Sequence, residues 1–262
     1  MVEEMLLVEK RGYICTLTLN RPEKRNALSP ELLAKLEDSF CNLARDEEVR
    51  VVVLRGSGEL AFSAGFDVAR LEEEAIRRRT YGQGFFDSCL TALLAYPRPV
   101  IAMIYGYAVG GGLELAAACD LRLAADNATL GHPAARMGQV ESYTLIQMFL
   151  RLLGLSRTKE LLFTGRTMDA QRAKEIGLVD EVVPARDLPS ATYKLASEIA
   201  ENSPLSITST KLILSKLLEH ERPGPLLAAE LDAIVLRGDD SEDAREGPRA
   251  FLEKRKPRFV GR

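Results

Sequence analysis

The strongest constraint on the fold is an apolar run that leads into three consecutive glycines and then into a helix-forming segment. Residues 99–104 read PVIAMI, Gly110, Gly111 and Gly112 follow, and residues 113–119 read LELAAAC. Because β-branched residues favour strands and alanine favours helices, this order predicts a strand, a glycine turn and a helix. Glycine lets another group approach the backbone closely, and the first N–H groups of a helix are unpaired donors. The turn is therefore suited to holding a negative charge.

Glu114 falls in the first turn of the predicted helix. Two interpretations stand side by side: its carboxylate complements the positive end of the helix dipole, or it takes part in catalysis. A dinucleotide-binding loop is a poor interpretation of the glycines, because residues 106–112 do not follow the spacing G-x-G-x-x-G.

Composition narrows the class of protein. The 262 residues are 46% hydrophobic and 28% charged, which suits one α/β core with a helical appendage. A net charge of −3 gives no basic footprint, so we expect no nucleic acid partner. No apolar run approaches the ~20 residues that span a bilayer, and the first residues do not resemble a signal peptide, so we expect a cytoplasmic protein without a membrane partner. Scattered cysteines and only two histidines predict reduced thiols and no metal site.

Periodicity predicts the order of the elements. Residues 5–9 and 13–19 predict a β-hairpin, and residues 50–56 predict a buried strand. Between them, Ser29 as N-cap and Pro30 as first helical residue predict a helix to about residue 44. Three later helices are predicted at residues 188–201, 205–218 and 225–236.

A second glycine turn precedes the first one in the chain. Residues 61–67 read AFSAGFD, and Asp67 is the predicted N-cap of a following helix. The turn at Ala64 and Gly65 and the turn at residues 110–112 both present backbone N–H groups. Two such groups that converge from separate turns form an oxyanion hole, which binds the negative oxygen of a reacting carbonyl group.

Together these segments resemble the enoyl-CoA hydratase/isomerase (crotonase) family. The resemblance is carried by residues 20–22 (NRP), 26–28 (NAL), 61–67, 97–102 (PRPVIA) and 106–120, and it continues across essentially the whole chain. It implies an α/β fold in which ββα units form a spiral, here residues 1–200 with the CoA and acyl site. It also implies a helical C-terminal region, residues 201–262, that mediates trimerisation and closes the CoA site. The expected assembly is a homotrimer or a homohexamer.

The resemblance further implies an acyl-CoA thioester as partner, with no cofactor beyond the CoA of the substrate. By position, the N–H groups of Ala64 and Gly111 would hold the thioester oxygen, and Glu114 would move a proton. An enolate stabilised in this way is common to enoyl-CoA hydration, double-bond isomerisation, dehalogenation and decarboxylation. The resemblance favours hydration or isomerisation. The alternatives are other lyase or decarboxylase chemistry, and acyl-CoA binding with little catalysis.

One position departs from the family pattern. Family members that hydrate enoyl-CoA usually carry a second glutamate where this chain has Ala134, and a methyl group transfers no proton. Glu141, in the following turn, either replaces that glutamate or complements the dipole of the next helix. Tyr143 either offers a hydroxyl to the substrate or packs in the core. His132 is predicted to be solvent-facing or structural, because the sequence shows no partner that would tune its pKa.

The resemblance also implies the substrate contacts. Basic Lys24 and Arg25 would meet the CoA phosphates. The basic C-terminal segment is either a solvated tail or closes over the CoA site with Phe251 and Lys254. Residues 70–79 and 81–86 would cover the acyl pocket, where Phe85 and Phe86 either shape the pocket or pack in the core. The full predicted substrate-binding set is Lys24, Arg25, Ala27, Ala64, Gly65, Phe66, Asp67, Gly111, Tyr143, Phe251 and Lys254.

Overall fold

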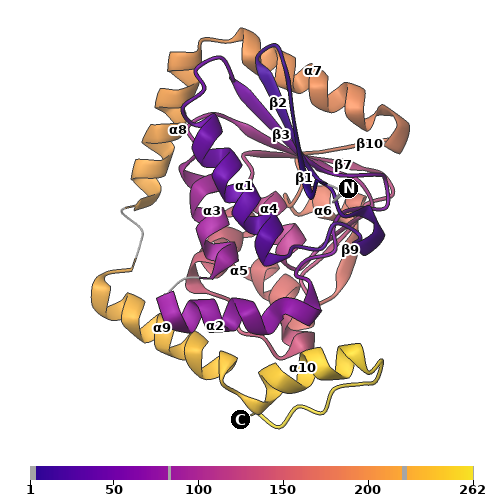
Figure 1. Ribbon diagram of the computed structural model, residues 1–262, viewed down its shortest axis with the longest axis vertical. Helices are drawn as coiled ribbons and strands as arrows, with labels where there is room; N and C mark the ends of the chain where they lie inside the picture. Colours follow the sequence, from indigo (N-terminus) through magenta and orange to yellow (C-terminus); the bar gives the residue numbers. More distant parts are fainter. Residues whose placement is uncertain (1–3, 82–83, 220–222, 262) are drawn as a thin grey trace.

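The computed structural model describes residues 4–81, 84–219 and 223–261, and it consists of two β-sheets surrounded by helices (Figure 1). The larger sheet has the strand order β1 (Leu6–Arg11), β2 (Ile14–Leu19), β3 (Val51–Gly56), β5 (Val100–Ile104), β7 (Leu121–Ala125) and β10 (Glu181–Val183). The smaller sheet has the order β4 (Ala61–Ser63), β6 (Tyr107–Val109), β8 (Thr129–Gly131) and β9 (Thr167–Asp169). The pairs β1–β2 and β8–β9 are antiparallel, and the other neighbours are parallel.

Helices connect and cover these strands. The α-helices are α1 (Pro30–Leu43), α2 (Leu71–Tyr81), α3 (Phe85–Ala95), α4 (Gly111–Ala118), α5 (Tyr143–Thr164), α6 (Ala170–Glu175), α7 (Leu188–Glu201), α8 (Pro204–Glu219), α9 (Pro225–Asp239) and α10 (Glu242–Leu252). The short 3-10 helices are η1 (Pro22–Lys24), η2 (Val68–Arg70), η3 (Ala134–Met137) and η4 (Ala185–Asp187). None of the helices in the described residues is long and apolar enough to cross a membrane.

Successive strands alternate between the two sheets. β3, β5 and β7 lie in the larger sheet, whereas β4, β6 and β8, which follow them in the chain, lie in the smaller one. A helical segment follows each pair: α2 and α3, then α4, then η3 and α5. The chain therefore winds through ββα repeats, and each repeat brings the end of a short strand and the start of a helix to the same region.

The centre of the larger sheet is buried on both faces, because β3 and β5 are apolar at every position but one. Val52 and Leu54 point into a core shared with α1, α3, α4 and α5. Val51 and Val53, on the opposite face, pack with α7. This alternation follows from the two-residue period of a strand. A rigid two-layer core thus supports the strand ends where the glycine turns lie.

Most predicted elements are confirmed by the structure. The hairpin, the strand at β3 and the helices α1, α7, α8 and α9 occupy the predicted segments within a few residues. Ser29 caps α1 by accepting from the N–H of Leu32 at 3.4 Å. Pro30 fits the next position because the first helical N–H needs no partner.

Some short strands were not predicted, and one predicted helix cap is wrong. The strand predicted at residues 99–104 is confirmed as β5, but the chain turns at Gly106 and forms a further strand, β6, before the glycine turn. β8 and β9 likewise occupy segments where no strand was predicted. Asp67 does not cap the following helix with its side chain, because that carboxylate accepts from Arg21 instead. Each short strand is formed by pairing with distant residues, which a local pattern does not reveal.

The C-terminal helices α9 and α10 lie at the same end of the molecule as α2. In Figure 1, α9 and α10 run along the lower edge of the view beside α2. α10 packs on η3 so closely that a β-carbon built on Gly247 would lie 1.8 Å from the carbonyl oxygen of Met137. Gly138 also lies against α10, since a β-carbon built on it would be 2.2 Å from the carbonyl oxygen of Asp243. The close packing of α10 on η3 therefore requires glycine at both of these positions.

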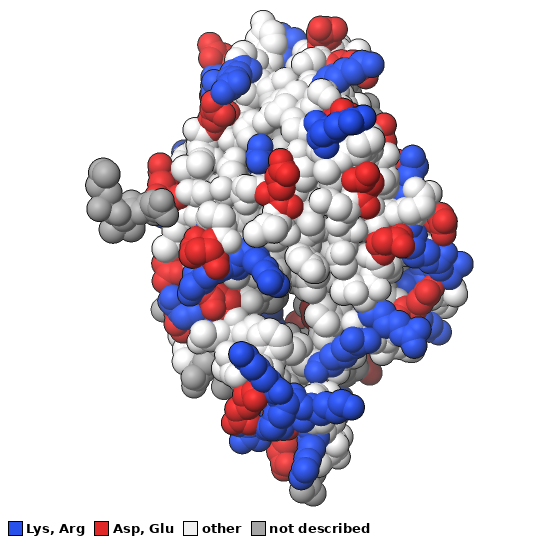
Figure 2. All heavy atoms as spheres, turned by 90° about the vertical axis from the view of Figure 1, so that its right-hand side faces the viewer, with Lys and Arg blue, Asp and Glu red and all other residues white. Residues whose placement is uncertain are grey.

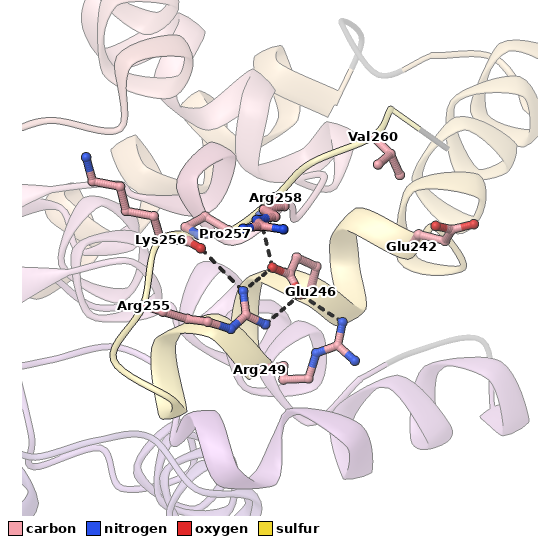
Figure 3. Close-up of a pocket in the computed structure, with 8 residues that line it drawn as sticks. All are labelled: Glu242, Glu246, Arg249, Arg255, Lys256, Pro257, Arg258 and Val260. Carbon is pink, nitrogen blue, oxygen red and sulfur yellow. Dashed lines mark hydrogen bonds and ion pairs between the residues drawn. The ribbon is translucent and has the colours of Figure 1, made fainter.

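The basic C-terminal segment is not a solvated tail. Glu246 of α10 accepts hydrogen bonds from Arg249, Arg255 and the backbone of Arg258 (Figure 3). These contacts hold the pKa of Glu246 below its usual range. Asp243 accepts from the N–H groups of Val260 and Gly261 at 2.6 and 3.0 Å. The segment is therefore tied to α10, and it borders a cavity of about 640 Å³.

Candidate active site

The two glycine turns predicted from the sequence lie against each other. A β-carbon built on Gly65 would lie 2.6 Å from the carbonyl oxygen of Val109 and 3.3 Å from the amide nitrogen of Gly111. A β-carbon on Gly112 would lie 2.4 Å from the carbonyl oxygen of Ser63. Glycine is required at these places because the backbone after β4 and the backbone after β6 are in direct contact.

Backbone hydrogen bonds show which N–H groups of these turns are free. The N–H of Ala64 donates to the carbonyl oxygen of Arg25 at 3.0 Å, so the predicted donor is already paired. Phe66 forms a parallel bridge with Leu28. The two backbone hydrogen bonds of this bridge join Leu28 to the residues before and after Phe66, and not to Phe66 itself. Its own N–H therefore points away from that bridge. Among the described residues, no acceptor meets the N–H of Phe66 or that of Gly111, the first residue of α4.

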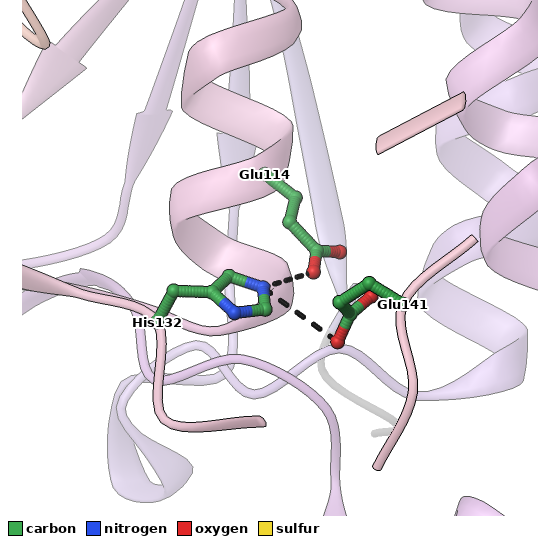
Figure 4. Close-up of side chains that lie close together, drawn as sticks. All are labelled: Glu114, His132 and Glu141. Carbon is green, nitrogen blue, oxygen red and sulfur yellow. Dashed lines mark hydrogen bonds and ion pairs between the residues drawn. The ribbon is translucent and has the colours of Figure 1, made fainter. Parts of the chain in front are cut away.

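Glu114, His132 and Glu141 come from three segments and point toward one another (Figure 4). Glu114 lies in the first turn of α4, His132 follows β8, and Glu141 lies in the loop that leads into α5. Parallel pairing of β6 with β8 sets Val109 opposite Gly131, so the residues that follow these two strands meet. Nε2 of His132 is hydrogen-bonded to Oε1 of Glu114 and lies 3.8 Å from Oε1 of Glu141.

This grouping overturns two interpretations from the sequence. The side chain of His132 is 1% exposed and has Glu114 as partner. Of the two predicted alternatives, solvent-facing or structural, the solvent-facing one is therefore wrong, as is the expectation that no partner is present. Glu141 is not in the first turn of α5, because that helix begins at Tyr143 and is capped by Ser142. Glu141 is therefore positioned by its loop and is free of the dipole role. Ala134 is buried in η3 and contributes no polar group.

Burial and mutual charge set the protonation of the three groups. Burial by itself lowers the pKa of His132, but the charge of Glu114, the hydrogen bond to it and the charge of Glu141 raise that pKa to about 9. Burial and the charge of Glu114 raise the pKa of Glu141 to about 8, against the opposing charges of His132 and Arg78. At neutral pH the favoured state is therefore a charged His132 beside a protonated Glu141.

The same three side chains are a conceivable cation site, since one ligand atom of each lies within 4.8 Å of the others. The contact between His132 and Glu114 argues for a shared proton. A hydrogen bond between an imidazole nitrogen and a carboxylate oxygen accounts for this contact without an ion.

A cavity of about 530 Å³ reaches this group from the C-terminal side. Glu141, with 16% of its side chain exposed, lies in the cavity wall, and the fully buried Glu114 lies behind it. Phe66 forms another part of the wall, so the cavity connects the free donor segment with the acid group. The other lining residues come from η2, α2, the loop before α5, α9 and α10: Val68, Ala69, Leu71, Arg78, Gln139, Val140, Asp239, Ala244, Arg245, Pro248 and Leu252.

Several predicted substrate contacts lie elsewhere. Phe251 is 59% exposed and Lys254 is exposed; neither lines this cavity, whereas Leu252 does. Tyr143 is half-buried at the start of α5 and is not part of the cavity wall. In Figure 2, Lys and Arg side chains gather in the lower part of the face shown, below a hollow in the surface.

α2 forms part of the cavity wall, as predicted for a segment that covers the acyl pocket. Phe86 is buried, with its ring centroid 5.0 Å from that of Phe66, and Phe85 lies under Arg77 at 4.2 Å. These two aromatic residues pack next to the site and do not line it. Residues 82–83 of the predicted covering segment lie outside the described residues.

The opening loop supports the first glycine turn. Arg21 is buried and donates to the carbonyl oxygen of Ala27 at 2.7 Å and to Asp67 at 3.0 Å. Lys24 lies 3.4 Å from the same Asp67 carboxylate with 53% of its side chain exposed. Arg25 is exposed beside the ring of Tyr107 at 5.6 Å. The two predicted phosphate-binding side chains therefore lie at the surface, next to the Ala64 turn.

Comparison with known proteins decides the family. The model of the enoyl-CoA hydratase/isomerase family matches residues 9–262. The chain belongs to the enoyl-CoA hydratase/isomerase family. The crotonase-like α/β fold expected from the resemblance is confirmed, because a solved structure of a methylmalonyl-CoA decarboxylase superimposes with a TM-score of 0.91, at 31% identity over 99% of both chains.

Sequence relatives in this family carry several names. A carnitinyl-CoA dehydratase of Citrobacter koseri is 36% identical over the full length of both chains. A short-chain-enoyl-CoA hydratase of Clostridium acetobutylicum is 33% identical over 96% of this chain and 95% of that protein. The common element in these names and in that of the structural neighbour is a CoA ester. The family therefore identifies an acyl-CoA enzyme, and it leaves the individual reaction to be argued from the site.

Sequence reasoning missed three features of the site. Phe66 was predicted to bind substrate, but its N–H was not singled out, because that group is free only through the bridge pairing with Leu28. Arg21 was noted only as part of the NRP motif, although it is the buried partner of Asp67. The pairing of His132 with Glu114 had one available signal: both residues directly follow predicted strand and turn segments, so neighbouring strands would bring them together.

Proposed function

We propose that this protein catalyses proton transfer at the acyl carbons of an enoyl-CoA thioester, in hydration or in double-bond isomerisation. The observation that carries the proposal is that the turns bearing two free backbone donors, Phe66 and Gly111, are in contact, and that Phe66 lines one cavity together with Glu141. Glu114 lies beside Glu141, behind the cavity wall. Membership of the enoyl-CoA hydratase/isomerase family supports it.

The donors act on the thioester oxygen. Removal of a proton from an acyl-CoA, or addition of hydroxide to an enoyl-CoA, moves negative charge onto that oxygen. Fixed N–H groups of Phe66 and Gly111 would stabilise this charge without reorganising, and one such donor lowers a barrier by ~3 kcal/mol. Both donors belong to the main chain, so the geometry of the two glycine turns determines this contribution.

The carboxyl groups act on the carbons. In hydration, one group takes a proton from water while a second delivers a proton to the α-carbon; in isomerisation, one group carries a proton between two carbons. Glu141 is the carboxyl group in the cavity wall, and Glu114 lies directly behind it. We propose that Glu141 supplies the function for which Ala134 has no side-chain group.

CoA would enter beside the opening loop. Lys24 and Arg25 are exposed next to the Ala64 turn, where they can meet phosphate groups without disturbing the core. The assembly remains a prediction of a homotrimer or homohexamer, and the division into residues 1–200 and 201–262 remains a prediction as well. An unusually apolar exposed surface on α8, with Leu212, Ile213 and Leu217 each about 60% exposed, supports association of copies.

The test is turnover of crotonyl-CoA and of 3-butenoyl-CoA by the wild-type protein and by Glu114→Gln and Glu141→Gln. We expect wild-type activity on at least one of the two substrates and a loss of about 100-fold or more in each variant. Glu48→Gln, whose side chain is 79% exposed and distant from the site, serves as control. Wild-type rates in both site variants would refute the proposal.

Decarboxylation is the second candidate, and one observation favours it. The methylmalonyl-CoA decarboxylase structure superimposes over nearly the whole chain, and this chain lacks the glutamate at position 134 that hydratases of the family usually carry. Loss of carbon dioxide also leaves an enolate, so the same donors would serve it. Release of carbon dioxide from methylmalonyl-CoA, without turnover of either enoyl-CoA, would select this reaction. Tight calorimetric binding of acyl-CoAs without any turnover would instead show a binding protein.

A further inference from the structure

The buried imidazole of His132 has no assigned purpose in the proposed reaction. It is enclosed by Glu114 on α4, by Glu141 on the loop before α5, and by Phe149 on α5, whose ring lies edge-on at 5.6 Å. A histidine kept only for packing does not need two carboxyl groups within 4.8 Å. Burying two acids next to one base suggests that charge is balanced among the three.

We propose that His132 is a positioning residue whose imidazolium holds Glu114 as a carboxylate, so that the mobile proton of the site resides on Glu141, the group that lines the cavity. This inference rests on the proposed function, because it assigns the roles of the two carboxyl groups in it. Three geometric observations carry it: the hydrogen bond of Nε2 to Glu114, the 3.8 Å separation from Glu141, and the unequal exposure of the two acids.

The distances divide the acids into unlike partners. Glu114 and His132 are each 1% exposed and in direct contact, so neither is well solvated alone and the ion pair is the low-energy state for both. Glu141 is farther from the imidazole, too far for a hydrogen bond, and a second full negative charge next to Glu114 is unfavourable. A proton on Glu141 removes this repulsion. The shifts of the pKa values described above agree with this state.

The total charge of the three side chains and the substrate stays constant during the proposed proton transfer. In the resting state the group holds one positive charge, one negative charge and one neutral acid. When Glu141 gives its proton to the α-carbon of an enolate, the enolate loses its negative charge and Glu141 gains one, so the total charge is conserved. The imidazolium 3.8 Å away then stabilises the new carboxylate until it takes a proton back from water or substrate.

Other charged groups face the cluster and leave this assignment intact. Arg78 of α2 lines the same cavity, and its charge lowers the pKa of Glu141. It is already paired with Asp239 of α9 at 3.1 Å and with Asp87 of α3 at 3.4 Å. Arg245 of α10 lines the same cavity and is exposed. Oε2 of Glu114 and Nδ1 of His132 are buried without a hydrogen-bond partner among the described residues. The ion pair that the two side chains form through Oε1 and Nε2 is therefore their main stabilising contact.

Imidazole NMR tests the charge state without any substrate. The chain has only two histidines, so the spectrum of ¹⁵N-histidine-labelled protein is simple, and His220→Gln assigns its signals. We expect both ring nitrogens of His132 to be protonated near neutral pH, and the pKa of the ring to fall by about two units in Glu114→Gln. A neutral His132 near pH 7, or an unchanged titration in Glu114→Gln, would overturn the inference.

A pH profile separates positioning from mere structure. His132→Gln keeps an N–H donor for Glu114 and removes the charge, whereas His132→Leu removes both. Exchange of the α-protons of butyryl-CoA with deuterated water measures enolate formation alone. In His132→Gln we expect the limb of the rate profile that Glu141 controls to move to higher pH by about one unit, since the charge of His132 lowers the pKa of Glu141. A uniform loss at all pH values would indicate a structural role and refute the inference.

These measurements distinguish the two proposals. Charged His132 by NMR, with no exchange or turnover of any acyl-CoA, would refute the proposed function and leave the charge assignment standing. If α-proton exchange occurs but its pH profile is the same in His132→Gln as in wild type, the charge assignment is refuted and the proposed function stands. A stoichiometric divalent ion in the purified protein that is lost in His132→Gln would show a metal site at these three residues and would also overturn the assignment.

Discussion

Gly65 and Gly111 face each other so closely that a β-carbon on Gly65 would lie 3.3 Å from the amide nitrogen of Gly111. This contact joins two turns that are separated by 45 residues in the numbering but lie at the ends of neighbouring strands, β4 and β6. It brings the free N–H of Phe66 to the same region as that of Gly111. The site therefore depends first on backbone geometry and only then on side chains.

The contact predicts a strong effect of a single methyl group. In Gly112→Ala, the new β-carbon would lie 2.4 Å from the carbonyl oxygen of Ser63, so the two turns must separate. We expect a loss of about 100-fold in kcat, the scale of removing one oxyanion donor, with a destabilisation of about 1–3 kcal/mol. Gly224→Ala is the matched control, because its β-carbon meets no atom within 4 Å. Steady-state kinetics and thermal unfolding check this, and an active Gly112→Ala would contradict it.

Stability is predicted to fall with rising pH through the buried cluster. Glu141 has an ordinary pKa of 4.5 that is raised to about 8, and His132 one of 6.5 raised to about 9. For a raised pKa the folded state binds the extra proton, so its stabilising effect is complete below the ordinary value and disappears as pH rises through the raised one. The contribution of this cluster to the Tm is therefore expected to decrease from about pH 4.5, the ordinary pKa of Glu141, to about pH 9, the raised pKa of His132. Calorimetry of wild type and Glu141→Gln checks this, and a flat wild-type profile would contradict it.

The buried ion pair of the opening loop is predicted to stabilise the first turn. The side chains of Arg21 and Asp67 are 10% and 12% exposed at 3.0 Å. In Arg21→Met, Asp67 retains only the exposed Lys24 at 3.4 Å, and we expect a loss of about 3–5 kcal/mol of unfolding free energy. The double variant with Asp67→Asn should lose less than the sum of the single variants, because no buried charge remains unpaired. Denaturant titration of all four proteins measures the coupling, and strict additivity would rule it out.

Docking of the last helix is predicted to depend on Gly247. A β-carbon there would lie 1.8 Å from the carbonyl oxygen of Met137, so Gly247→Ala must displace α10 from η3. Since α10 forms part of the cavity wall, we expect weaker acyl-CoA binding and faster proteolysis after residue 252, with the core still folded. Limited proteolysis with mass spectrometry checks the displacement. Protection equal to that of wild type would show that α10 is held by other contacts.

Association of copies is predicted to use the apolar surface of α8. Leu212 and Leu217 are 59% and 61% exposed, and no residue of this helix is buried. We expect a trimer or hexamer by light scattering, and dissociation when both leucines are changed to glutamate. Lys194→Glu, at an exposed site on α7, controls for the change in charge. A monomeric wild-type protein would refute the predicted assembly.

The sequence by itself determined the parts that follow from local patterns. The glycine turns, the cap at Ser29, the hairpin and the long C-terminal helices depend on neighbouring residues, and they occur where the pattern placed them. The family motifs around residues 61–67 and 106–120 identified the fold and the acyl-CoA class, and the family match agrees with both. The absence of the second glutamate could be read from the sequence, because it depends only on which residue stands at that position, here Ala134.

Only the tertiary structure decided which groups meet. The partner of His132 is 18 residues away and arrives through the parallel pairing of β6 with β8. The choice of Phe66 over Ala64 as donor depends on which backbone bonds Arg25 and Leu28 form. Pairing across strands and loops involves residues far apart in the chain, and a local pattern does not encode it. For this reason the sequence identified a carboxylate at the glycine turn, and the fold decided that a buried histidine and a second carboxyl group accompany it.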